Sequence, residues 1–205
     1  VKSSTNILIP NTKIVRLKDL QYELNKISLP IFLKPNKNGS SICSYIIKDL
    51  NNIKEILNEF YSHHQDEDEI LIQEYIENKI EVSCGCLEKK DLTFLQLPPI
   101  EIIPKSSEFF DYKSKYEKGA SLEKIPAIDI SSKQRKRISE LTIEIHKILG
   151  CRLYSRSDFL VTKDKIYYLE TNTLPGMTKT SLIPKEAKAI GLDFKELISF
   201  FIDNS

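Results

Sequence analysis

Hydrophobic and polar positions follow two different periods along this chain, and the change of period separates its elements. Apolar runs rich in β-formers predict strands, and apolar residues at helical spacing predict amphipathic helices. Strands are predicted at 13–17, 29–35, 42–47, 70–76, 80–87 and 92–97, and in a ribbon at 153–171. Helices are predicted at 18–28, 49–61, 131–149, 182–190 and 193–203. After the aromatic and basic segment Phe109–Tyr116, a loop is predicted to about Ser131. The first half is therefore predicted to be an antiparallel-rich sheet with helices on one side, an α+β pattern.

A predicted β-hairpin near the C-terminal end carries an uncommon set of polar side chains. Two runs rich in β-formers, SRSDFLV and KIYYLET, flank the polar linker 162–165, which is typical of a short hairpin loop. We take the hairpin to be centred on Asp164. Side chains alternate between the faces of a strand, so this centre puts Asp158 opposite Glu170. The side chains predicted on one face are those of Arg156, Asp158, Leu160, Tyr168, Glu170 and Asn172.

This face is suited to binding a cation together with phosphate. Two carboxylates and an amide offer oxygen ligands for a hard divalent cation, and the arginine beside them can bind phosphate. A solvated face with alternating charges is the alternative. It is disfavoured because the same face is partly apolar through Leu160 and Tyr168. After Asn172 the segment 173–178 contains Pro175 and Gly176, which predict a tight turn.

The composition is that of an ordinary globular protein. The chain has 205 residues, of which 40% are hydrophobic and 29% charged, and 30 basic residues balance 29 acidic ones. This balance gives no electrostatic reason to expect nucleic acid or an anionic membrane as a partner. No apolar run approaches the roughly 20 residues that span a bilayer. We therefore expect neither nucleic acid nor membrane binding.

The four cysteines indicate buried thiols more than a metal site. Cys84 and Cys86 are placed on one face of a predicted strand, but no second pair completes a zinc site. Reduced, mostly buried thiols in a cytosolic protein are the simpler interpretation.

A second candidate phosphate contact lies at the end of an early strand. Lys34 precedes a small-residue loop whose amides at 39–41 could donate to phosphate. The P-loop signature GxxxxGK[ST] is absent, and a turn of this kind alone is more often an ordinary connection. Together with the hairpin and with the basic and aromatic residues Lys113, Lys115 and Tyr116, it suggests phosphate held from two sides.

The ordered set of motifs resembles the D-alanine–D-alanine ligases. The segments that carry the resemblance are PIFLKPNKNGSSI, ILIQEYIENKIEVSCG, FFDYKSKY, LGCRLYSRSDFLV, YYLETNTLPGMTKTSLIP and GLDFKELI. They follow the family's order and spacing from about residue 10 to 203. The resemblance implies an ATP-grasp fold of two α+β subdomains, with antiparallel-rich sheets that sandwich the nucleotide. We expect the small central subdomain at 1–78 and the large C-terminal subdomain at 79–205.

The resemblance also implies the reaction. ATP phosphorylates the carboxylate of one D-alanine, the amine of a second D-alanine attacks the acyl phosphate, and ADP and phosphate leave. The product would be a peptidoglycan precursor made in the cytoplasm. Family members form homodimers and carry a further N-terminal lobe with a substrate-binding glutamate and an ATP-binding lysine. We expect that lobe to be absent from these 205 residues.

Nucleotide contacts are implied for residues in several motifs. Lys34 would contact the phosphates, and Glu81 would bind the ribose. The expected loop over the phosphates includes Ser40 and Ser41, the adenine linker includes Gln73, Glu74 and Ile76, and the adenine slot is lined by Phe32, Leu160 and Leu169. Leu169 conflicts with the alternation that places Glu170 on the site face, unless a bulge interrupts the strand.

Metal and catalytic roles fall on the hairpin and the turn after it. Asp158, Glu170 and Asn172 resemble the ligands of two Mg²⁺ ions, with Mn²⁺ as an alternative and Glu170 bridging the two. Arg156 would stabilise the transferred phosphoryl group, and the backbone N–H of Gly176 would act as an oxyanion donor.

The acceptor site and the closing loop are also implied. Ser181 and Leu182 would hold the carboxylate of the second D-alanine at the start of a helix. Lys115 and Tyr116 would belong to a mobile loop that closes over the site and excludes water.

Two local departures from the family pattern stand out. Cys43 replaces the glycine that usually follows the Gly-Ser-Ser loop, and the turn before Glu81 is one residue longer than usual. Two alternatives to a D-alanine–D-alanine ligase remain open: another ATP-grasp carboxylate–amine ligase, and a non-catalytic module that binds Mg·ATP.

Overall fold

The computed structural model describes residues 7–37, 43–49, 51, 53–66, 68–104 and 121–205. They form two compact units. The small unit contains residues 10–77, and the large unit contains residues 7–9, 78–103 and 121–205.

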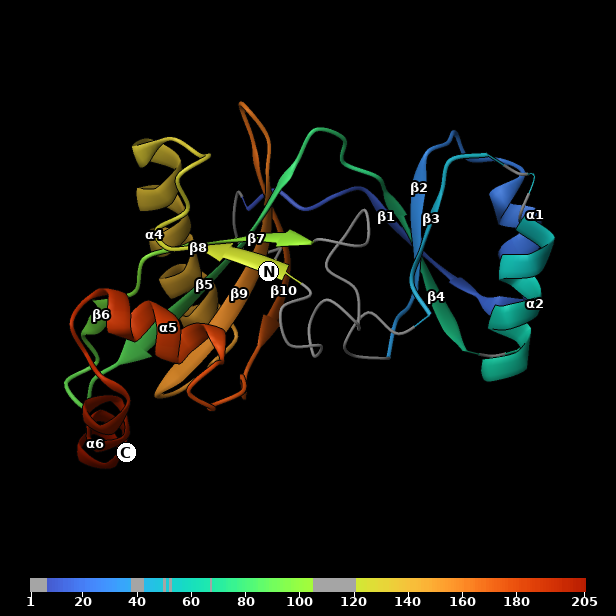
Figure 1. Cartoon of the computed structure of the whole chain (residues 1–205). Helices are drawn as coiled ribbons and strands as arrows, with labels where there is room; N and C mark the ends of the chain where they lie inside the picture. Colours follow the sequence, from blue (N-terminus) through green and yellow to red (C-terminus); the bar gives the residue numbers. More distant parts are fainter. Residues whose placement is uncertain (1–6, 38–42, 50, 52, 67, 105–120) are drawn as a thin grey trace. The chain divides into compact units, whose positions relative to one another are not determined.

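The small unit is a four-stranded antiparallel sheet with helices on one side (Figure 1). The strands lie in the order β1-β4-β2-β3. Their bounds are β1 Thr12–Arg16, β2 Ile31–Pro35, β3 Tyr45–Ile47 and β4 Glu69–Glu74, and the helices are η1 Leu17–Asp19, α1 Leu20–Leu24 and α2 Ile53–His63. The core between sheet and helices includes Leu33, Phe60 and Ile70, all with 0% exposed surface. Alternation along β2 leaves Phe32 and Lys34 on the opposite face.

The large unit is built on a second antiparallel sheet. Its strands lie in the order β10-β9-β5-β7-β8, and β6 also pairs with β5. The strand bounds are β5 Ile80–Glu88, β6 Phe94–Gln96, β7 Ile100–Pro104, β8 Ser121–Lys124, β9 Tyr154–Val161 and β10 Ile166–Asn172. The helices are α4 Ser132–Ile148, α5 Leu182–Ala189 and α6 Phe194–Asn204. None of the described helices is both long and apolar enough to cross a membrane.

Helices cover the two faces of this sheet unequally. Helix α4 packs on the face that carries Val82, Cys84 and Phe159. On the other face, α5 and α6 form a smaller cluster with Leu87 and Leu97 (Figure 1). The residues of β5 and β9 that alternate with the α4-facing ones therefore lie on the α5 side. The predicted hairpin site lies on that side.

The α+β prediction is confirmed, and most elements form where the sequence pattern placed them. Helix α4 begins with a capping box: Ser131 Oγ accepts from the Gln134 N–H, and the Gln134 side chain accepts from the Ser131 N–H. It ends before Gly150, whose φ of 64° suits a helix terminus.

Three boundary predictions were wrong. Helix α2 spans Ile53–His63 instead of the predicted 49–61, and before it the Asp49 carboxylate accepts from the Asn51 N–H at 2.8 Å. Helix α1 ends at Leu24, well before Pro30, a residue that disfavours helix just upstream. The loop predicted after residue 116 contains strand β8 at Ser121–Lys124, which pairs with the edge of β7.

Candidate functional site

The hairpin of β9 and β10 has the predicted pairing at its open end. Asp158 lies opposite Glu170, and Arg156 lies opposite Asn172. Directly opposed residues project from the same face of a sheet. The structure therefore brings these four side chains together on the α5 side of the large sheet.

A β-bulge corrects the pairing nearer the turn. The loop is 162–165, and the register shifts between Tyr168 and Glu170, which makes Leu169 the extra residue. Before the bulge Tyr168 lies opposite Phe159, their ring centroids are 6.0 Å apart, and both belong to the core under α4. The prediction that Tyr168 shares the anionic face was therefore wrong. Alternation allowed both Leu169 and Glu170 in the site only if a bulge interrupted the strand, and the structure contains that bulge.

Arg156 and Asp158 form a two-point ion pair on this face. Arg156 Nε donates to Asp158 Oδ1 and Nη2 donates to Oδ2, both at 3.1 Å. Ser83 lies opposite Asp158 on β5, and its hydroxyl donates to Oδ1 at 2.6 Å. The two charged side chains are only 16% and 19% exposed. Three donors thus fix the orientation of the Asp158 carboxylate.

The electric field on this face is dominated by carboxylates. Burial acts to lower the pKa of Arg156, but Asp158, and then Glu186 and Glu170, raise that pKa above its ordinary value. The guanidinium therefore stays charged. The opposed carboxylates of Asp158 and Glu170 on this face favour a cation.

The oxygen donors of the hairpin fit Mg²⁺. Glu170 and Asn172 are exposed at the edge of the sheet, and Asn172 Oδ1 also accepts from the Leu174 N–H at 3.0 Å. In the described part of the chain, no three or more His, Cys, Asp or Glu side chains gather tightly enough to hold a metal by themselves. Such an open set suits Mg²⁺, which usually keeps several waters and binds through one or two carboxylates plus substrate phosphates.

A hydroxyl cluster lies where the chain enters α5. Ser181 Oγ accepts from the Thr178 N–H at 3.1 Å and lies 2.9 Å from Thr178 Oγ1. Its side chain does not cap α5. A Cβ on Gly176 would lie 3.1 Å from Ser181 Oγ, so a glycine allows this close approach. Leu182 is the first residue of α5 and is buried.

Glu81 extends the same face toward the hairpin loop. It pairs with Leu160 on β9, as Ser83 pairs with Asp158. Leu160 is 8% exposed. The turn before β5 includes Asn78 at a positive φ of 49°, consistent with the unusual length noted in the sequence.

Three of the predicted nucleotide contacts lie on one face of the small unit. Phe32 and Gln73 are directly opposed, and Lys34 shares the face of Phe32. Gln73 Nε2 donates to Thr12 Oγ1 at 2.9 Å. Glu74 ends β4, exposed, and its carboxylate accepts from the Asn11 N–H at 3.2 Å. Ile76 follows and is 5% exposed.

Four predicted site residues lie outside the described residues: Ser40, Ser41, Lys115 and Tyr116. The neighbouring Cys43 is described, and its φ is 52°. That is the left-handed region, which glycine enters freely and other residues enter at a cost. Cys43 therefore has a backbone conformation that would suit the glycine usual at this position in the family.

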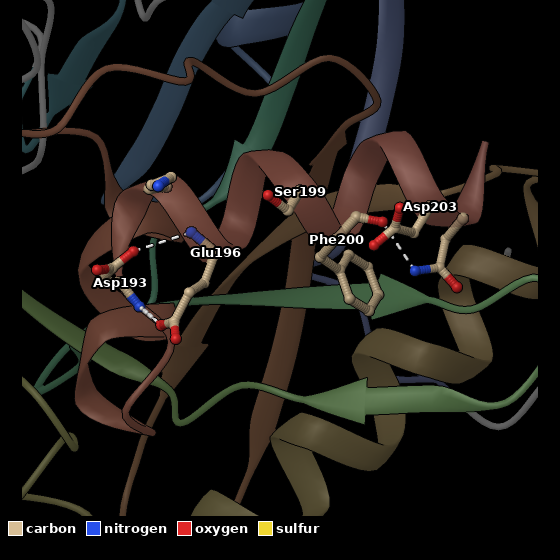
Figure 2. Close-up of a pocket in the computed structure, with 7 residues that line it drawn as sticks. Asp193, Glu196, Ser199, Phe200 and Asp203 are labelled. Atoms are coloured by element: carbon tan, nitrogen blue, oxygen red, sulfur yellow. Dashed lines mark hydrogen bonds between the residues drawn. The ribbon is translucent and has the colours of Figure 1, made fainter.

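A surface pocket on α6 does not include the predicted site residues. It is lined by Asp193, Lys195, Glu196, Ser199, Phe200, Asp203 and Asn204. Figure 2 shows that Asp193 and Glu196 hydrogen-bond each other's backbone N–H. These two carboxylates therefore cap the helix.

Sequence reasoning missed two residues of the site. Ser83 follows Glu81 by two positions, so the alternation of β5 already placed it on the same face. Glu186 lies within α5 and has 0% exposed surface. Its position, four residues after the apolar Leu182, was the only signal that it faces inward.

Comparison with known proteins decides the family. The sequence model of the family described as "D-ala D-ala ligase C-terminus" matches residues 7–203. The chain belongs to this family. The D-alanine--D-alanine ligase of Leptospira interrogans is 44% identical over 184 residues, which are 88% of this chain and 51% of that protein. The Clostridium beijerinckii ligase is 36% identical, over 89% of this chain and 57% of that protein. The chain thus spans about half the length of the curated relatives it matches.

Solved ligase structures share the fold of this D-Ala–D-Ala ligase family member. A Bacillus anthracis D-alanine--D-alanine ligase complexed with ATP gives a TM-score of 0.73 at 29% identity, over 97% of this chain and 60% of that one. The VanG D-Ala:D-Ser ligase of Enterococcus faecalis gives 0.77 at 30% identity, over 96% of this chain and 56% of that one. The ATP-grasp prediction is confirmed.

Proposed function

We propose that this chain carries the nucleotide- and metal-binding part of an ATP-dependent ligase that joins two D-alanines for peptidoglycan synthesis in the cytoplasm. The two units are proposed to be the ATP-grasp subdomains predicted at 1–78 and 79–205, and the whole protein is proposed to act as a homodimer. One observation carries the proposal: Arg156, Asp158, Glu170 and Asn172 share one face of a single hairpin.

Each step of the proposed reaction requires charge stabilisation. In the first step, a carboxylate oxygen of D-alanine attacks the γ-phosphorus of ATP, the bond to the bridging oxygen breaks, and ADP leaves. In the second, the amine of another D-alanine attacks the acyl carbon, loses a proton, and displaces inorganic phosphate. Mg²⁺ held by Asp158, Glu170 and Asn172 would neutralise phosphate charge when bound. Arg156 places a fixed guanidinium beside these ligands, where it can bind the transferred phosphoryl group.

The remaining residues take the roles that the resemblance gives them. Glu81 and Leu160 on the large unit, and Phe32 and Lys34 on the small unit, are proposed to contact the nucleotide. The same proposal extends to Gln73, Glu74, Ile76 and Leu169, and to the loop residues Ser40, Ser41, Lys115 and Tyr116.

The turn into α5 is proposed to receive the second amino acid. Ser181 keeps its hydroxyl out of the helix cap, so it can donate to a carboxylate. The N–H groups at the start of α5, beginning near Leu182, favour an anion by their orientation. The Gly176 N–H would stabilise the oxyanion of the tetrahedral intermediate.

A second candidate differs only in the acceptor. The likeness to a D-Ala:D-Ser ligase favours testing D-serine as the attacking amino acid. D-alanine and D-serine differ by one hydroxyl, which an apolar pocket rejects weakly. A panel of D-amino acids as acceptors, with D-alanine as donor, separates the two candidates.

The test uses ADP release with D-alanine. Because the relatives are about twice as long, we use a chimera in which the unmatched part of the Leptospira ligase precedes this chain. We expect D-alanine-dependent turnover in the chimera. We also expect the 205-residue chain to bind Mg·ATP in isothermal titration calorimetry.

Two variants of the hairpin make the test specific. Asp158→Ala should lower turnover by at least about a hundredfold, the effect of losing transition-state charge stabilisation. Asp164→Ala removes the same charge from an exposed position in the hairpin loop and should leave turnover unchanged. Full turnover in Asp158→Ala would refute the proposal. Mg·ATP binding without any turnover in the chimera would support a non-catalytic module.

A further inference from the structure

The β-bulge in β10 decides which residue lies opposite Asp158. On the loop side of the bulge, Tyr168 lies opposite Phe159. Continued without a bulge, that pairing would put Leu169 opposite Asp158 and would turn Glu170 to the α4 side of the sheet. The extra residue instead brings Glu170 opposite Asp158. The proposed metal site therefore depends on the bulge as well as on its oxygen ligands.

A row of three hydroxyls joins the two sides of this bulge. The Tyr168 hydroxyl, on the loop side, donates to Thr171 Oγ1 at 3.0 Å. Thr171 Oγ1 also lies 2.7 Å from Ser157 Oγ, and Ser157 is the residue opposite it on β9. Ser157 has 0% exposed surface. The hydroxyls thus form a short chain that passes the bulge and ends, buried, on the neighbouring strand.

The bond between Tyr168 and Thr171 requires the bulge. Residues i and i+3 of a regular strand project from opposite faces. The bulge adds one residue between Tyr168 and Thr171, so both project from the α4 side of the sheet, opposite alternate residues of β9. The same insertion turns Glu170 to the site face. The hydroxyl bond and the placement of Glu170 are therefore two results of one backbone irregularity.

The Tyr168 side chain is held in place and kept protonated for this bond. Its ring packs against Phe159 in the core under α4, with centroids 6.0 Å apart. Its backbone N–H donates to the Leu8 carbonyl at 2.9 Å. Burial raises the pKa of Tyr168 by more than the hydrogen bond to Thr171 lowers it. The phenol therefore keeps its proton and remains a donor.

We propose that Tyr168 and Thr171 are positioning residues for Glu170: their hydroxyl bond closes the bulge and so holds Glu170 on the face of Asp158, where the proposed Mg²⁺ would bind. The inference rests on the proposed function. Both side chains lie on the α4 side of the sheet, so they act through the backbone. The alternative is that the hydroxyls only satisfy one another in the core, while strand pairing alone fixes the bulge.

Two nearly isosteric substitutions separate the two roles. Tyr168→Phe keeps the ring and Thr171→Val keeps the branched shape, but each removes the hydroxyl bond. Thr171→Ser keeps a hydroxyl at the same position and should preserve the wild-type behaviour. Tyr154→Phe is the matched control, because it removes a phenolic hydroxyl from β9, where the Tyr154 ring packs on Phe201 with centroids 4.7 Å apart.

The first measurement needs neither nucleotide nor metal. Amide hydrogen exchange of residues 169–172 is followed by NMR in the 205-residue chain. We expect Tyr168→Phe and Thr171→Val to speed this exchange about two- to tenfold, the effect of one lost neutral hydrogen bond. The double variant should exchange no faster than Thr171→Val, because both changes remove the same bond. Exchange in β5 should not change.

The second measurement tests whether the bulge positions a metal ligand. Isothermal titration calorimetry gives the affinity for an ATP analogue that cannot be hydrolysed, with and without Mg²⁺. In Tyr168→Phe, the affinity with Mg²⁺ should fall about tenfold, as for other residues that orient metal ligands, while the affinity without Mg²⁺ should not change. Thr171→Ser and Tyr154→Phe should match the wild type in both measurements. A purely structural role would leave the Mg²⁺ dependence unaltered.

The results that would overturn the inference differ from those that would overturn the proposed function. Unchanged exchange near the bulge in Tyr168→Phe would show that the hydroxyl bond does not close it. Faster exchange with an unaltered Mg²⁺ dependence would leave only the structural role. If one variant does not fold, the other decides, because Tyr168→Phe and Thr171→Val remove the same bond. Failure of the wild-type chain to bind the analogue with Mg²⁺ would refute the proposed function and the metal-positioning role with it.

Discussion

The close approach of α5 to β5 predicts that residue 85 must be glycine. In Gly85→Ala the new Cβ would lie 2.8 Å from Glu186 Oε2 and 2.9 Å from both Ile183 Cγ1 and Leu97 Cδ1. Contacts this short force the helix or the carboxylate to move. Because Gly85 pairs with Arg156 on β9, displacement of the helix changes the packing over this pair of strands.

The expected cost combines three effects. Overpacking of a core contact costs about 1–3 kcal/mol. If the carboxylate moves away, the Gly85 N–H loses its partner, which costs about 1–3 kcal/mol when the group stays buried. Alanine recovers about 0.5–1 kcal/mol because glycine is disfavoured in a strand. We therefore expect Gly85→Ala to lower the free energy of opening of the large sheet by about 1–5 kcal/mol.

Hydrogen exchange measured by mass spectrometry suits this test, because the two units need not unfold together. Peptides from β5 and β9 should lose protection about fivefold or more, since each 1.4 kcal/mol is a factor of about ten. Peptides from β2 and β4 in the small unit should not change. Gly150→Ala is the control: its φ is 64° but nothing lies within 4 Å of the new Cβ, so its cost is backbone strain alone.

A double-mutant cycle identifies the contact responsible. Glu186→Ala removes the side chain nearest to the new Cβ, so the double variant Gly85→Ala/Glu186→Ala should be more stable than the sum of the single effects by about 1 kcal/mol or more. Additive effects would refute the argument. So would a cost of Gly85→Ala below about 0.5 kcal/mol, which is the range of ordinary surface substitutions.

Three further predictions follow from single contacts. Ser83→Ala removes a donor to the Asp158 carboxylate and should weaken Mg²⁺-dependent ATP binding in calorimetry about 10-fold or more, as for other outer-sphere partners of metal ligands; unchanged binding would show that Ser83 does not orient Asp158. Burial lowers the pKa of His146 below its ordinary value of 6.5. As the pH falls below about 6.5, the unfolded chain therefore binds a proton at His146 before the folded chain does, and the free energy of unfolding decreases until the pH passes the folded-state pKa. His146→Gln should reduce this dependence of unfolding on pH, and an unaltered dependence would contradict the argument. Cys43→Gly should stabilise the small unit by roughly 0.5–1 kcal/mol by removing left-handed strain at φ 52°, measured as slower exchange in β3, and a loss of protection there would contradict it.

The hairpin shows how far alternation alone can predict a site. A centre at Asp164 gave the correct partners for Asp158 and Arg156. Nearer the turn, the observed pairs are shifted by one residue from the predicted ones. The extra residue in β10, Leu169, accounts for this shift. Periodicity cannot reveal a bulge, because an extra residue changes the face of every residue on one side of it. For that reason Tyr168 was placed on the wrong face while Glu170 was placed correctly.

Glu186 shows what sequence patterns leave out. A glutamate in a short helix is usually exposed, and the spacing of four residues from Leu182 is only a weak sign that this one faces inward. Its partner, Gly85, lies in a different element, at a break between two strand pairings. Such a contact depends on the tertiary packing of α5 on β5, and no local period encodes it. The strands and long helices were predictable because each buries one face by itself.

The bulge in β10 and the gap at Gly85 of β5 lie in the two strands that flank β9. β9 pairs with β5 without a shift from Tyr154 to Val161, so Arg156 and Asp158 stand on a regular strand. The bulge in β10 brings Glu170 opposite Asp158, and the gap at Gly85 between the β7 and β6 pairings of β5 makes room for the Glu186 carboxylate. Changes at either irregularity should therefore alter the side chains that surround Arg156 and Asp158. The irregularities of β10 and of the β5 edge therefore determine which carboxylates surround the site, while the ion pair of Arg156 and Asp158 depends on the regular alternation of β9.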